Sequence, residues 1–318
     1  MIRVLLLCMA TLAALPVQAQ YPTKPIRFIV PFPPGGGTDT NSRALTQRIA
    51  KSTGWTFVID NKPGAGGNIG AEQAAKAPPD GHTLVMGQTS NLAINPFLYA
   101  KPPFDAVSDF APIALVSAVP LVIIGSMKSP YRSMGDLIKA AKAKPESVTF
   151  ASPGNGTVGH LAGEIIARIA GVKLVHVPYK GAGPALSDLI GGQVDLYLST
   201  PQAAVGQIKA GTVAALAVSA PRRIATLPQV PTLAESGLQG AEVTSWYGVL
   251  APAKTPEAIL QRLNAEIIKA LAAPEVRDSL TGEGGEVLGG TPAAFAAFLQ
   301  AEQAKWSKVV REAGVKVD

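Results

Sequence analysis

The sequence is poor in the residues on which most enzymes and disulfide-stabilised proteins depend. It has one cysteine, Cys8, and three histidines in 318 residues, with no G-x-S-x-G or S-x-x-K motif. Cys8 lies in an N-terminal apolar run that we expect to be removed, so the mature chain would have no disulfide and no thiol nucleophile. Aromatic residues make up 6%, charged residues 16% and hydrophobic residues 47%, a balance that excludes a disordered chain. Binding is therefore expected rather than catalysis.

The N-terminal segment has the layout of a secretory signal peptide. Arg3 precedes an apolar run from Val4 to Leu15, and small residues follow at Val17 and Ala19. A membrane anchor is the alternative, but a run of about 12 residues is shorter than the ~20 needed to span a bilayer. We expect cleavage after Ala19 and a soluble periplasmic protein.

Basic residues are in modest excess, with 28 Lys and Arg against 22 Asp and Glu, a formal net charge of +6. They are scattered and never form a run of four or more, so we expect no nucleic-acid partner. The excess favours anionic small molecules as ligands but does not identify one.

Short runs of β-branched and apolar residues alternate with amphipathic stretches, which predicts an α/β protein with a largely parallel sheet. A strand at Ile26–Phe32 precedes a glycine-rich turn and a helix at Thr40–Gly54. About 120 residues later the order recurs, with a strand at Val148–Ser152, a glycine-rich turn and a helix at His160–Gly171. Two copies of one plan predict two similar lobes rather than a single large sheet.

Two segments, Phe110–Ser126 and Ala241–Pro252, are long enough to connect the lobes and predict a hinge. The C-terminal part is predicted to be helical, with Thr255 and Thr291 as N-caps that each precede a proline. The predicted organisation is a signal peptide at 1–19, a first lobe at 20–120 plus 246–318, and a second lobe at 121–245, with hinge crossings near 117–124 and 242–250.

Both glycine-rich turns lie where a strand gives way to a helix, the position at which parallel α/β folds bind ligands. Glycine there lets the backbone adopt positive φ and approach a ligand, while free N–H groups at the helix N-terminus favour an anion. Either turn alone is explained equally well as a tight turn, but two facing across one cleft suit a ligand with a carboxylate at each end. The turns supply Gly35, Gly36, Gly37, Thr38 and Asp39 in the first copy, and Ser152, Gly154, Asn155, Gly156 and Thr157 in the second.

Three other functions of these residues are weaker. Gly154 to Gly159 fits G-x-G-x-x-G, but no acidic residue follows the next strand to hold a ribose, so we expect no dinucleotide cofactor. His160 and Glu164 could ligate a metal, yet no third ligand is apparent, and a ligand hydrogen bond is the better expectation for His160. Asp39 could be a general base, although a carboxylate in a first helical turn more often accepts backbone N–H bonds.

Several long motifs carry a family resemblance: YPTKPIRFIVPFPPGGGTD, NKPGAGGNIG, FASPGNGTVGHLAGE, HVPYKGAGPALSDLIGGQVD and SWYGVLAPAKTP. In these the chain resembles the tripartite tricarboxylate transporter receptors, also called Bug proteins, which are periplasmic solute-binding proteins. The resemblance implies a type II periplasmic-binding-protein fold, in which two α/β lobes joined by a two-strand hinge enclose a ligand cleft. It also implies capture of a di- or tricarboxylate, amino acid or aromatic acid, and delivery to a membrane permease of one large and one small subunit. We expect a monomer without cofactor or metal.

The resemblance further implies ligand-binding residues on both sides of the cleft. The loop from Phe32 to Asp39 is expected to meet one carboxylate, partly through water, and the turn at 152–157 with His160 and Tyr179 faces it. Residues at other strand ends are candidates by position. The full expected set is Phe32, Pro33, Pro34, Gly35, Gly36, Thr38, Asp39, Thr89, Ser90, Ser152, Asn155, Gly156, Thr157, His160, Tyr179 and Thr200.

Two alternatives share this architecture. A periplasmic hydrolase or isomerase could use the same cleft, but the missing catalytic motifs argue against it. A receptor that presents its closed state to a membrane signalling protein is the other alternative. Trp246 and Tyr247, in the returning segment, either line the cleft or pack within the hinge.

Overall fold

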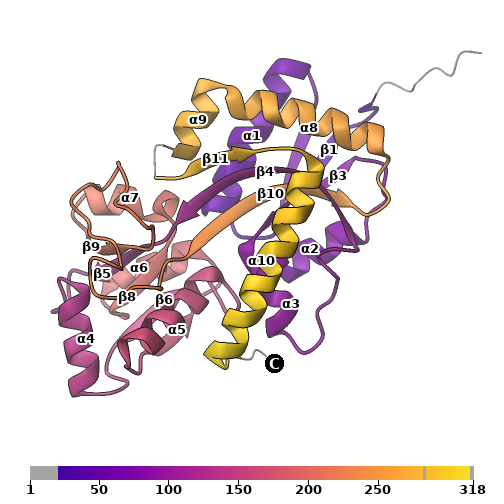
Figure 1. Cartoon of the computed structure of the whole chain (residues 1–318). Helices are drawn as coiled ribbons and strands as arrows, with labels where there is room; N and C mark the ends of the chain where they lie inside the picture. The colour runs from indigo at the N-terminus through magenta and orange to yellow at the C-terminus, as the bar shows by residue number, and fades with distance from the viewer. Residues whose placement is uncertain (1–20, 282–283, 316–318) are drawn as a thin grey trace, which may run out of the picture.

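The computed structural model describes residues 21–281 and 284–315. The predicted signal peptide lies outside the described residues. Within them, two β-sheets form separate lobes, each covered by helices (Figure 1). None of the helices in these ranges has the length and apolar character needed to cross a membrane.

The first sheet has six strands in the order β11-β4-β10-β3-β1-β2. β1 pairs in parallel with β2 and β3, whereas β10 runs antiparallel to both β3 and β4. β11 adds to β4 as an antiparallel edge strand. The strands are β1 Ile26–Val30, β2 Phe57–Asn61, β3 Thr83–Gln88, β4 Phe110–Pro120, β10 Thr244–Pro252 and β11 Glu286–Gly289.

The second sheet has five strands in the order β7-β6-β8-β5-β9. β6 pairs in parallel with β7 and β8, and β5 runs antiparallel to β8 and β9. The strands are β5 Val122–Ser126, β6 Thr149–Ser152, β7 Val175–Pro178, β8 Leu196–Ser199 and β9 Val213–Val218.

The two sheets repeat one topology, as the internal repeat predicted. β2-β1-β3 followed by antiparallel β10 in the first lobe corresponds to β7-β6-β8 followed by antiparallel β5 in the second. The prediction of a largely parallel sheet is confirmed only for the core of each sheet, because β10 and β11 of the first sheet and β5 of the second run in the opposite direction. β4 leads directly into β5 through Leu121, and β10 returns to the first sheet. The residue boundaries given above for the lobes stay a prediction.

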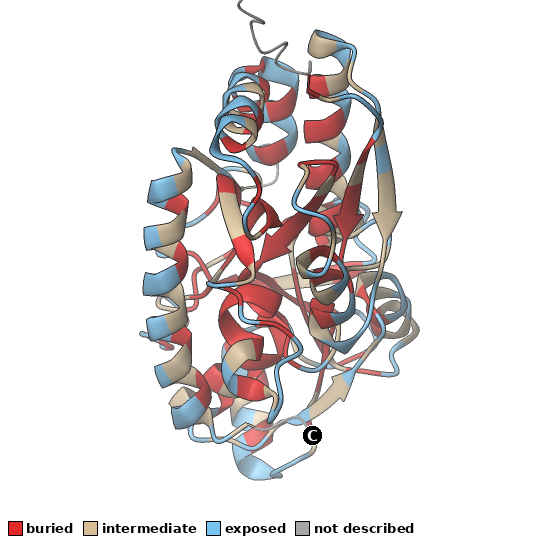
Figure 2. Ribbon diagram, turned by 90° about the vertical axis from the view of Figure 1, so that its right-hand side faces the viewer, coloured by how far each residue is buried: buried red, intermediate tan, exposed pale blue. Residues whose placement is uncertain are grey.

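Helices cover both sheets and leave the central strands largely buried (Figure 2). In the first lobe they are α1 Gly37–Thr53, η1 Ala65–Gly67, α2 Asn68–Ala75, the π-helical η2 Ser90–Ile94, α3 Asn95–Leu98, α8 Glu257–Ala272, α9 Pro274–Thr281 and α10 Pro292–Ala313. In the second lobe they are α4 Met134–Ala143, α5 Val158–Ala170, α6 Ala182–Gly191 and α7 Pro201–Lys209.

The helix ends follow local sequence signals. α1 and α5 end at Gly54 and Gly171, whose φ angles of 74° and 64° place them in the left-handed region that glycine adopts without steric cost. Thr291 caps α10 through a hydrogen bond from the Ala294 N–H, as predicted. Thr255 does not cap α8, because that helix begins after Pro256 and the Thr255 hydroxyl donates to a carbonyl upstream instead.

The lobes are in direct contact. α10 extends from the first sheet to α5 of the second lobe (Figure 1). One buried hydrophobic cluster includes Ile94 and Leu98 of the first lobe, Leu161 and Ile165 of α5, and Val310 of α10. The hydrophobic core thus continues from one lobe into the other.

Candidate functional site

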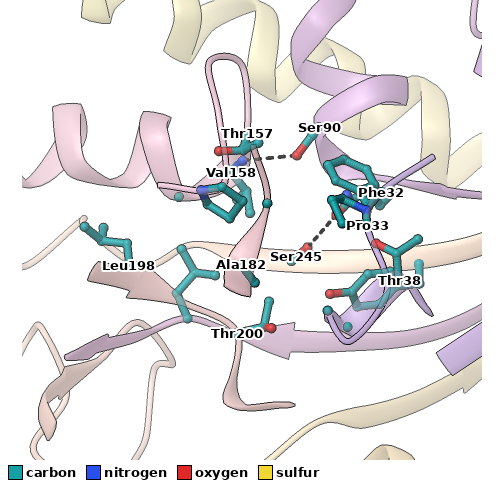
Figure 3. Close-up of a pocket in the computed structure, with 18 of the residues that line it drawn as sticks. Phe32, Pro33, Thr38, Ser90, Thr157, Val158, Ala182, Leu198, Thr200 and Ser245 are labelled. Atoms are coloured by element: carbon teal, nitrogen blue, oxygen red, sulfur yellow. Dashed lines mark hydrogen bonds between the residues drawn. The ribbon is translucent and has the colours of Figure 1, made fainter. Parts of the chain in front are cut away.

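A pocket lies between the lobes at the carboxyl ends of the parallel strands (Figure 3). This inner pocket measures about 530 Å³ including its open side. None of its lining residues carries a formal charge. Hydroxyl and amide groups line it together with apolar side chains. It is lined by Phe32, Pro33, Gly36, Gly37, Thr38, Gln88, Ser90, Leu121, Pro153, Thr157, Val158, Gly159, Gly181, Ala182, Tyr197, Leu198, Thr200, Ser245 and Tyr247.

Four helices direct their N-termini toward this pocket. α1 contributes Gly36, Gly37 and Thr38; the other helices are α5, α6 and α7, with α7 represented by its N-cap Thr200. The first N–H groups of a helix have no acceptor within the helix, and its N-terminus carries a partial positive charge. The pocket therefore favours an anion without using a cationic side chain.

The first turn, residues 31–36, is held in place by Asp39 from the third position of α1. Its carboxylate accepts the Gly35 N–H at 3.1 Å, Arg43 Nε at 2.9 Å and Asn61 Nδ2 at 3.0 Å. Burial raises the pKa of Asp39, but these hydrogen bonds and the Arg43 charge outweigh it and lower the pKa below its ordinary value. Asp39 is thus ionised and already satisfied, which supports a loop-ordering role rather than that of a general base.

The second turn, residues 153–157, is held in the same way by His160 from the third position of α5. Its Nδ1 accepts the Gly156 N–H at 3.3 Å, and the ring stacks on His176 at a centroid distance of 3.9 Å. Burial lowers the pKa of His160 to about 4, and burial together with His160 lowers the pKa of His176 to about 3. Both imidazoles are neutral at neutral pH, so His160 carries its proton on Nε2.

Other side chains tie the strand ends together. Ser152 Oγ lies 2.7 Å from His176 Nε2 and donates to the Gly154 carbonyl. Thr89 Oγ1 accepts the Trp246 N–H at 2.8 Å. These two predicted site residues therefore make hydrogen bonds within the protein.

One hydrogen bond crosses the cleft at the pocket wall. Val158 N–H, in the first turn of α5, donates to Ser90 Oγ of the first lobe at 3.1 Å (Figure 3). In α1, Asp39 N–H and Thr40 N–H bond back to Gly36 O. Within the described chain, this leaves Gly37 N–H and Thr38 N–H as first-turn donors for a ligand.

Trp246 and Tyr247, the aromatic pair of β10, point in different directions. Tyr247 lines the inner pocket, whereas Trp246 packs on the other side against Phe295 and Phe298. The Trp246 indole N–H donates to Glu302 of α10 at 2.8 Å. Successive residues of a strand point to opposite faces, which explains the division.

A second space, the outer pocket, adjoins the inner one and measures about 1170 Å³ including its open side. Phe32, Pro33, Pro153 and Gly181 border both pockets. A Cβ on Gly181 would lie 2.6 Å from Pro33 Cγ, so the lobes touch at this border. Further lining residues of the outer pocket are Pro63, Gly64, Ala65, Gly66, Gly67, Tyr99, Gly154, Asn155, Pro178, Tyr179 and Lys180.

The structure brings together part of the predicted site. The inner pocket contains Phe32, Pro33, Gly36, Thr38, Ser90, Thr157 and Thr200. The outer pocket contains Phe32 and Pro33 again, with Asn155 and Tyr179. Neither pocket is lined by Pro34, Gly35, Asp39, Thr89, Ser152, Gly156 or His160. The His160 ring contacts Gly156 and His176, and a direct ligand contact for it stays a prediction.

Gly36 does not use the positive φ that glycine permits in these turns. Its φ is −89° and its ψ 171°, which any residue adopts, and no atom lies within 4 Å of a Cβ placed there. Gly35 and Gly156 do have positive φ, at 85° and 74°. Gly36 thus matters for the open space that it leaves at the pocket, whereas Gly156 matters for its conformation and for its contact with Asn95 of the opposite lobe.

Pocket residues outside the expected set fall into two groups. Some lie within motifs that the sequence analysis quoted, namely Gly37, Pro153, Val158, Gly159, Gly181, Ala182, Ser245 and Tyr247. No local motif marks the others, which meet only through the strand order: Gln88, Leu121, Tyr197 and Leu198.

His160 and Glu164 do not form part of a metal site in the described chain. His160 Nε2 lies 3.9 Å from Glu164 Oε1. Among residues 21–281 and 284–315, no group of three or more His, Cys, Asp or Glu side chains is placed to hold a metal ion.

Known proteins are similar to this chain in sequence and in fold. A family model described as the tripartite tricarboxylate transporter family receptor matches residues 42–315. The solved periplasmic binding protein BugD is 36% identical, covers 93% of this chain and 99% of its own, and superposes with a TM-score of 0.89.

Two further solved structures from Rhodopseudomonas palustris contain carboxylates. Rpa4515 with adipate is 35% identical with a TM-score of 0.90, over 93% of this chain and 99% of its own. MatC with bound malate is 34% identical with a TM-score of 0.86, over 91% of this chain and 100% of its own. The chain therefore belongs to the tripartite tricarboxylate transporter receptor family and has the two-lobed α/β fold of its periplasmic binding proteins.

Proposed function

We propose that this protein is a periplasmic receptor that closes its lobes around a small carboxylate and delivers it, as a monomer, to a two-subunit membrane permease. The observation that carries the proposal is the convergence of four helix N-termini on one uncharged pocket between the lobes. Helix N-termini bind anions through backbone N–H groups and the helix dipole. The relatives that hold adipate and malate support a carboxylate as that anion.

Closure would follow from a ligand that contacts both lobes. Gly37 and Thr38 offer N–H groups from α1, and Gly159 lies opposite them in the first turn of α5. A ligand bound to both sets stabilises the closed form relative to the open one by its differential affinity. The apolar wall formed by Leu121 and Leu198 would contact the carbon skeleton between the polar groups.

The lining of the inner pocket also supports binding without catalysis. It contains no Asp, Glu, His, Cys or Lys. The side chains that most often act as general acid, general base or activated nucleophile do not line the pocket, although Ser, Thr and Tyr do. We therefore propose a receptor rather than a hydrolase or isomerase.

A thermal-shift screen of mono-, di- and tricarboxylates, amino acids and aromatic acids tests the proposal, followed by calorimetric titration of each acid that responds. A ligand that binds only the folded state raises the melting temperature. At a ligand concentration of a hundred times Kd, it adds about 2.7 kcal/mol to the free energy of unfolding. We expect at least one carboxylate to bind without chemical change. Turnover of a carboxylate, or no response to any, would contradict the proposal.

Delivery is tested separately. Vesicles containing the permease should accumulate the labelled ligand only when the receptor is added. Uptake that is independent of the receptor would contradict delivery while leaving carboxylate binding intact.

A further inference from the structure

Gln202 lies in the first turn of α7, two residues after the pocket residue Thr200. A Cβ placed on Gly37 would lie 3.4 Å from Gln202 Oε1 and would collide with the Tyr247 hydroxyl. Gly37 and Tyr247 both line the inner pocket. The Gln202 amide therefore reaches from the second lobe to the edge of the pocket, beside the N-terminus of α1.

Both polar atoms of this amide are buried without a hydrogen-bond partner. Gln202 is the only described residue with two such atoms, Nε2 and Oε1. Burying an unpaired amide costs free energy, and native structures usually avoid it. A purely structural role does not account for the residue, because leucine has a similar volume and would be buried there without this cost.

A further unpaired atom lies elsewhere between the lobes. Asn95 Oδ1, from the first lobe, has no partner and faces Gly156 of the second lobe. Unpaired groups on both facing surfaces disfavour closed lobes unless a ligand or its bound water completes the hydrogen bonds.

We propose that Gln202 is a ligand-recognition residue of the second lobe. Its unpaired amide atoms would hydrogen-bond to a carboxylic acid bound at the N-terminus of α1, directly or through one bridging water. This rests on the proposed function. A carboxylate can accept from Nε2 but cannot donate to Oε1. The donor is either a hydroxyl beside the carboxylate or a water molecule that the carboxylate holds. The inference therefore points to hydroxycarboxylates or hydrated carboxylates as the ligand class.

Calorimetric titration with succinate and malate tests the recognition role, because these acids differ by one hydroxyl. Gln202→Leu should lower the affinity about tenfold to a hundredfold, the effect of losing a hydrogen bond to a charged group. Gln202→Glu keeps the shape but adds a negative charge, and should lower the affinity further. Loss of a malate preference in Gln202→Leu assigns the second hydrogen bond to the ligand hydroxyl, whereas equal losses for both acids assign it to water.

Thr226→Val is the matched control, since Thr226 Oγ1 is another unpaired buried atom and Thr226 lines neither pocket. The control should bind both acids as the wild type does. The proposal would be overturned if Gln202→Leu bound both acids with the affinity of the wild type.

Small-angle X-ray scattering without ligand gives a readout that does not depend on the ligand's identity. Gln202→Leu should make the free protein more compact, because the unpaired amide no longer opposes closure, and Thr226→Val should not. If the wild type bound no carboxylate, the proposed function would fail, while compaction of Gln202→Leu would still support the role of Gln202. Absence of compaction would contradict that role.

Discussion

The first and second turns occupy equivalent places in the two lobes but are held by different chemistry. In each, a side chain at the third helical position accepts the N–H of the residue before the N-cap. Asp39 accepts from Gly35 in the first turn, and His160 accepts from Gly156 in the second. The first acceptor is an anion neutralised by Arg43, and the second is a neutral imidazole. The comparison shows that the turns share a requirement for a buried acceptor, and that neither offers the ligand a charged side chain.

The largest expected effect comes from replacing Gly36 in the first turn, and it should differ from the effect of replacing Gly156 in the second. Gly36→Val should place its side chain in open space at the pocket and block the Gly37 and Thr38 donors. Each hydrogen bond to a charged group is worth about 1.5–3 kcal/mol, so affinity should fall about a hundredfold or more while stability changes little. Calorimetric titration and urea unfolding measure both quantities.

Gly156→Val is the matched variant in the second turn. Its φ of 74° and its collision with Asn95 should lower stability by about 1–2 kcal/mol, in addition to weakening binding. Equal losses of stability for both variants would contradict the distinction between the two glycines.

Removing the acceptors should produce the next largest effect. Asp39→Ala leaves the Gly35 N–H and the Asn61 amide without this acceptor, and should destabilise the protein by about 2–3 kcal/mol. His160→Ala leaves only the Gly156 N–H without its acceptor, and should cost about 1 kcal/mol for that hydrogen bond. Equilibrium urea unfolding gives both values, and a larger loss for His160→Ala would reverse the comparison.

The turns should also respond differently to acid. An unfolded histidine titrates near pH 6.5, whereas the pKa of His160 is lowered to about 4 in the folded state. Between these values the unfolded state binds a proton that the folded state does not, so stability falls as the pH falls from about 6.5 to about 4. The slope is at most about 1.4 kcal/mol per pH unit for each such histidine, and smaller for the more exposed His176.

The contribution of Asp39 to stability also falls with falling pH, but over a lower pH range. Its pKa is lowered because hydrogen bonds stabilise the charged form, whereas burial disfavours the charged form of His160. Because its pKa is lowered on folding, its contribution is present above about pH 4 and is lost as the pH falls further. Urea unfolding between pH 7.5 and 4.5 measures how the free energy of unfolding changes with pH, and this change should be smaller in His160→Gln than in the wild type. An equal change would contradict the lowered pKa of His160.

The smallest expected effect concerns Arg43 of α1, the cation that pairs with Asp39. The Arg43 side chain is 45% exposed, and its ion pair with Asp39 should contribute less than about 1 kcal/mol. Arg43→Gln leaves the Asp39 charge less neutralised, so carboxylate affinity should fall about twofold to fivefold. The fall should shrink with added salt, and a salt-independent change would indicate a structural effect instead.

Local patterns in the sequence predicted the repeated strand-turn-helix units and the hinge segments well. The Thr40 start of the first helix was late by three residues, because Gly37 and Thr38 adopt helical geometry despite weak propensity. Two further features were not encoded locally. Gly36 is extended while Gly35 has positive φ, and the antiparallel β5 and β10 follow from the chain's crossing between the lobes.

The site was predictable where it coincides with a motif and not elsewhere. Phe32, Thr38 and Thr157 come from glycine-rich turns and line the inner pocket. Leu121 and Leu198 look like ordinary strand residues, and only the strand order brings them to the pocket. Gln202 carried no signal, because its distinguishing property is the absence of a partner in the folded chain.

Amide proton chemical shifts during titration with a bound carboxylate test the central claim most directly. If backbone donors on both lobes hold the ligand, the Gly37, Thr38 and Gly159 amide protons should all move downfield and saturate together. Movement confined to one lobe, or to side-chain signals while these amides stay unchanged, would contradict a carboxylate held between two helix-capped turns.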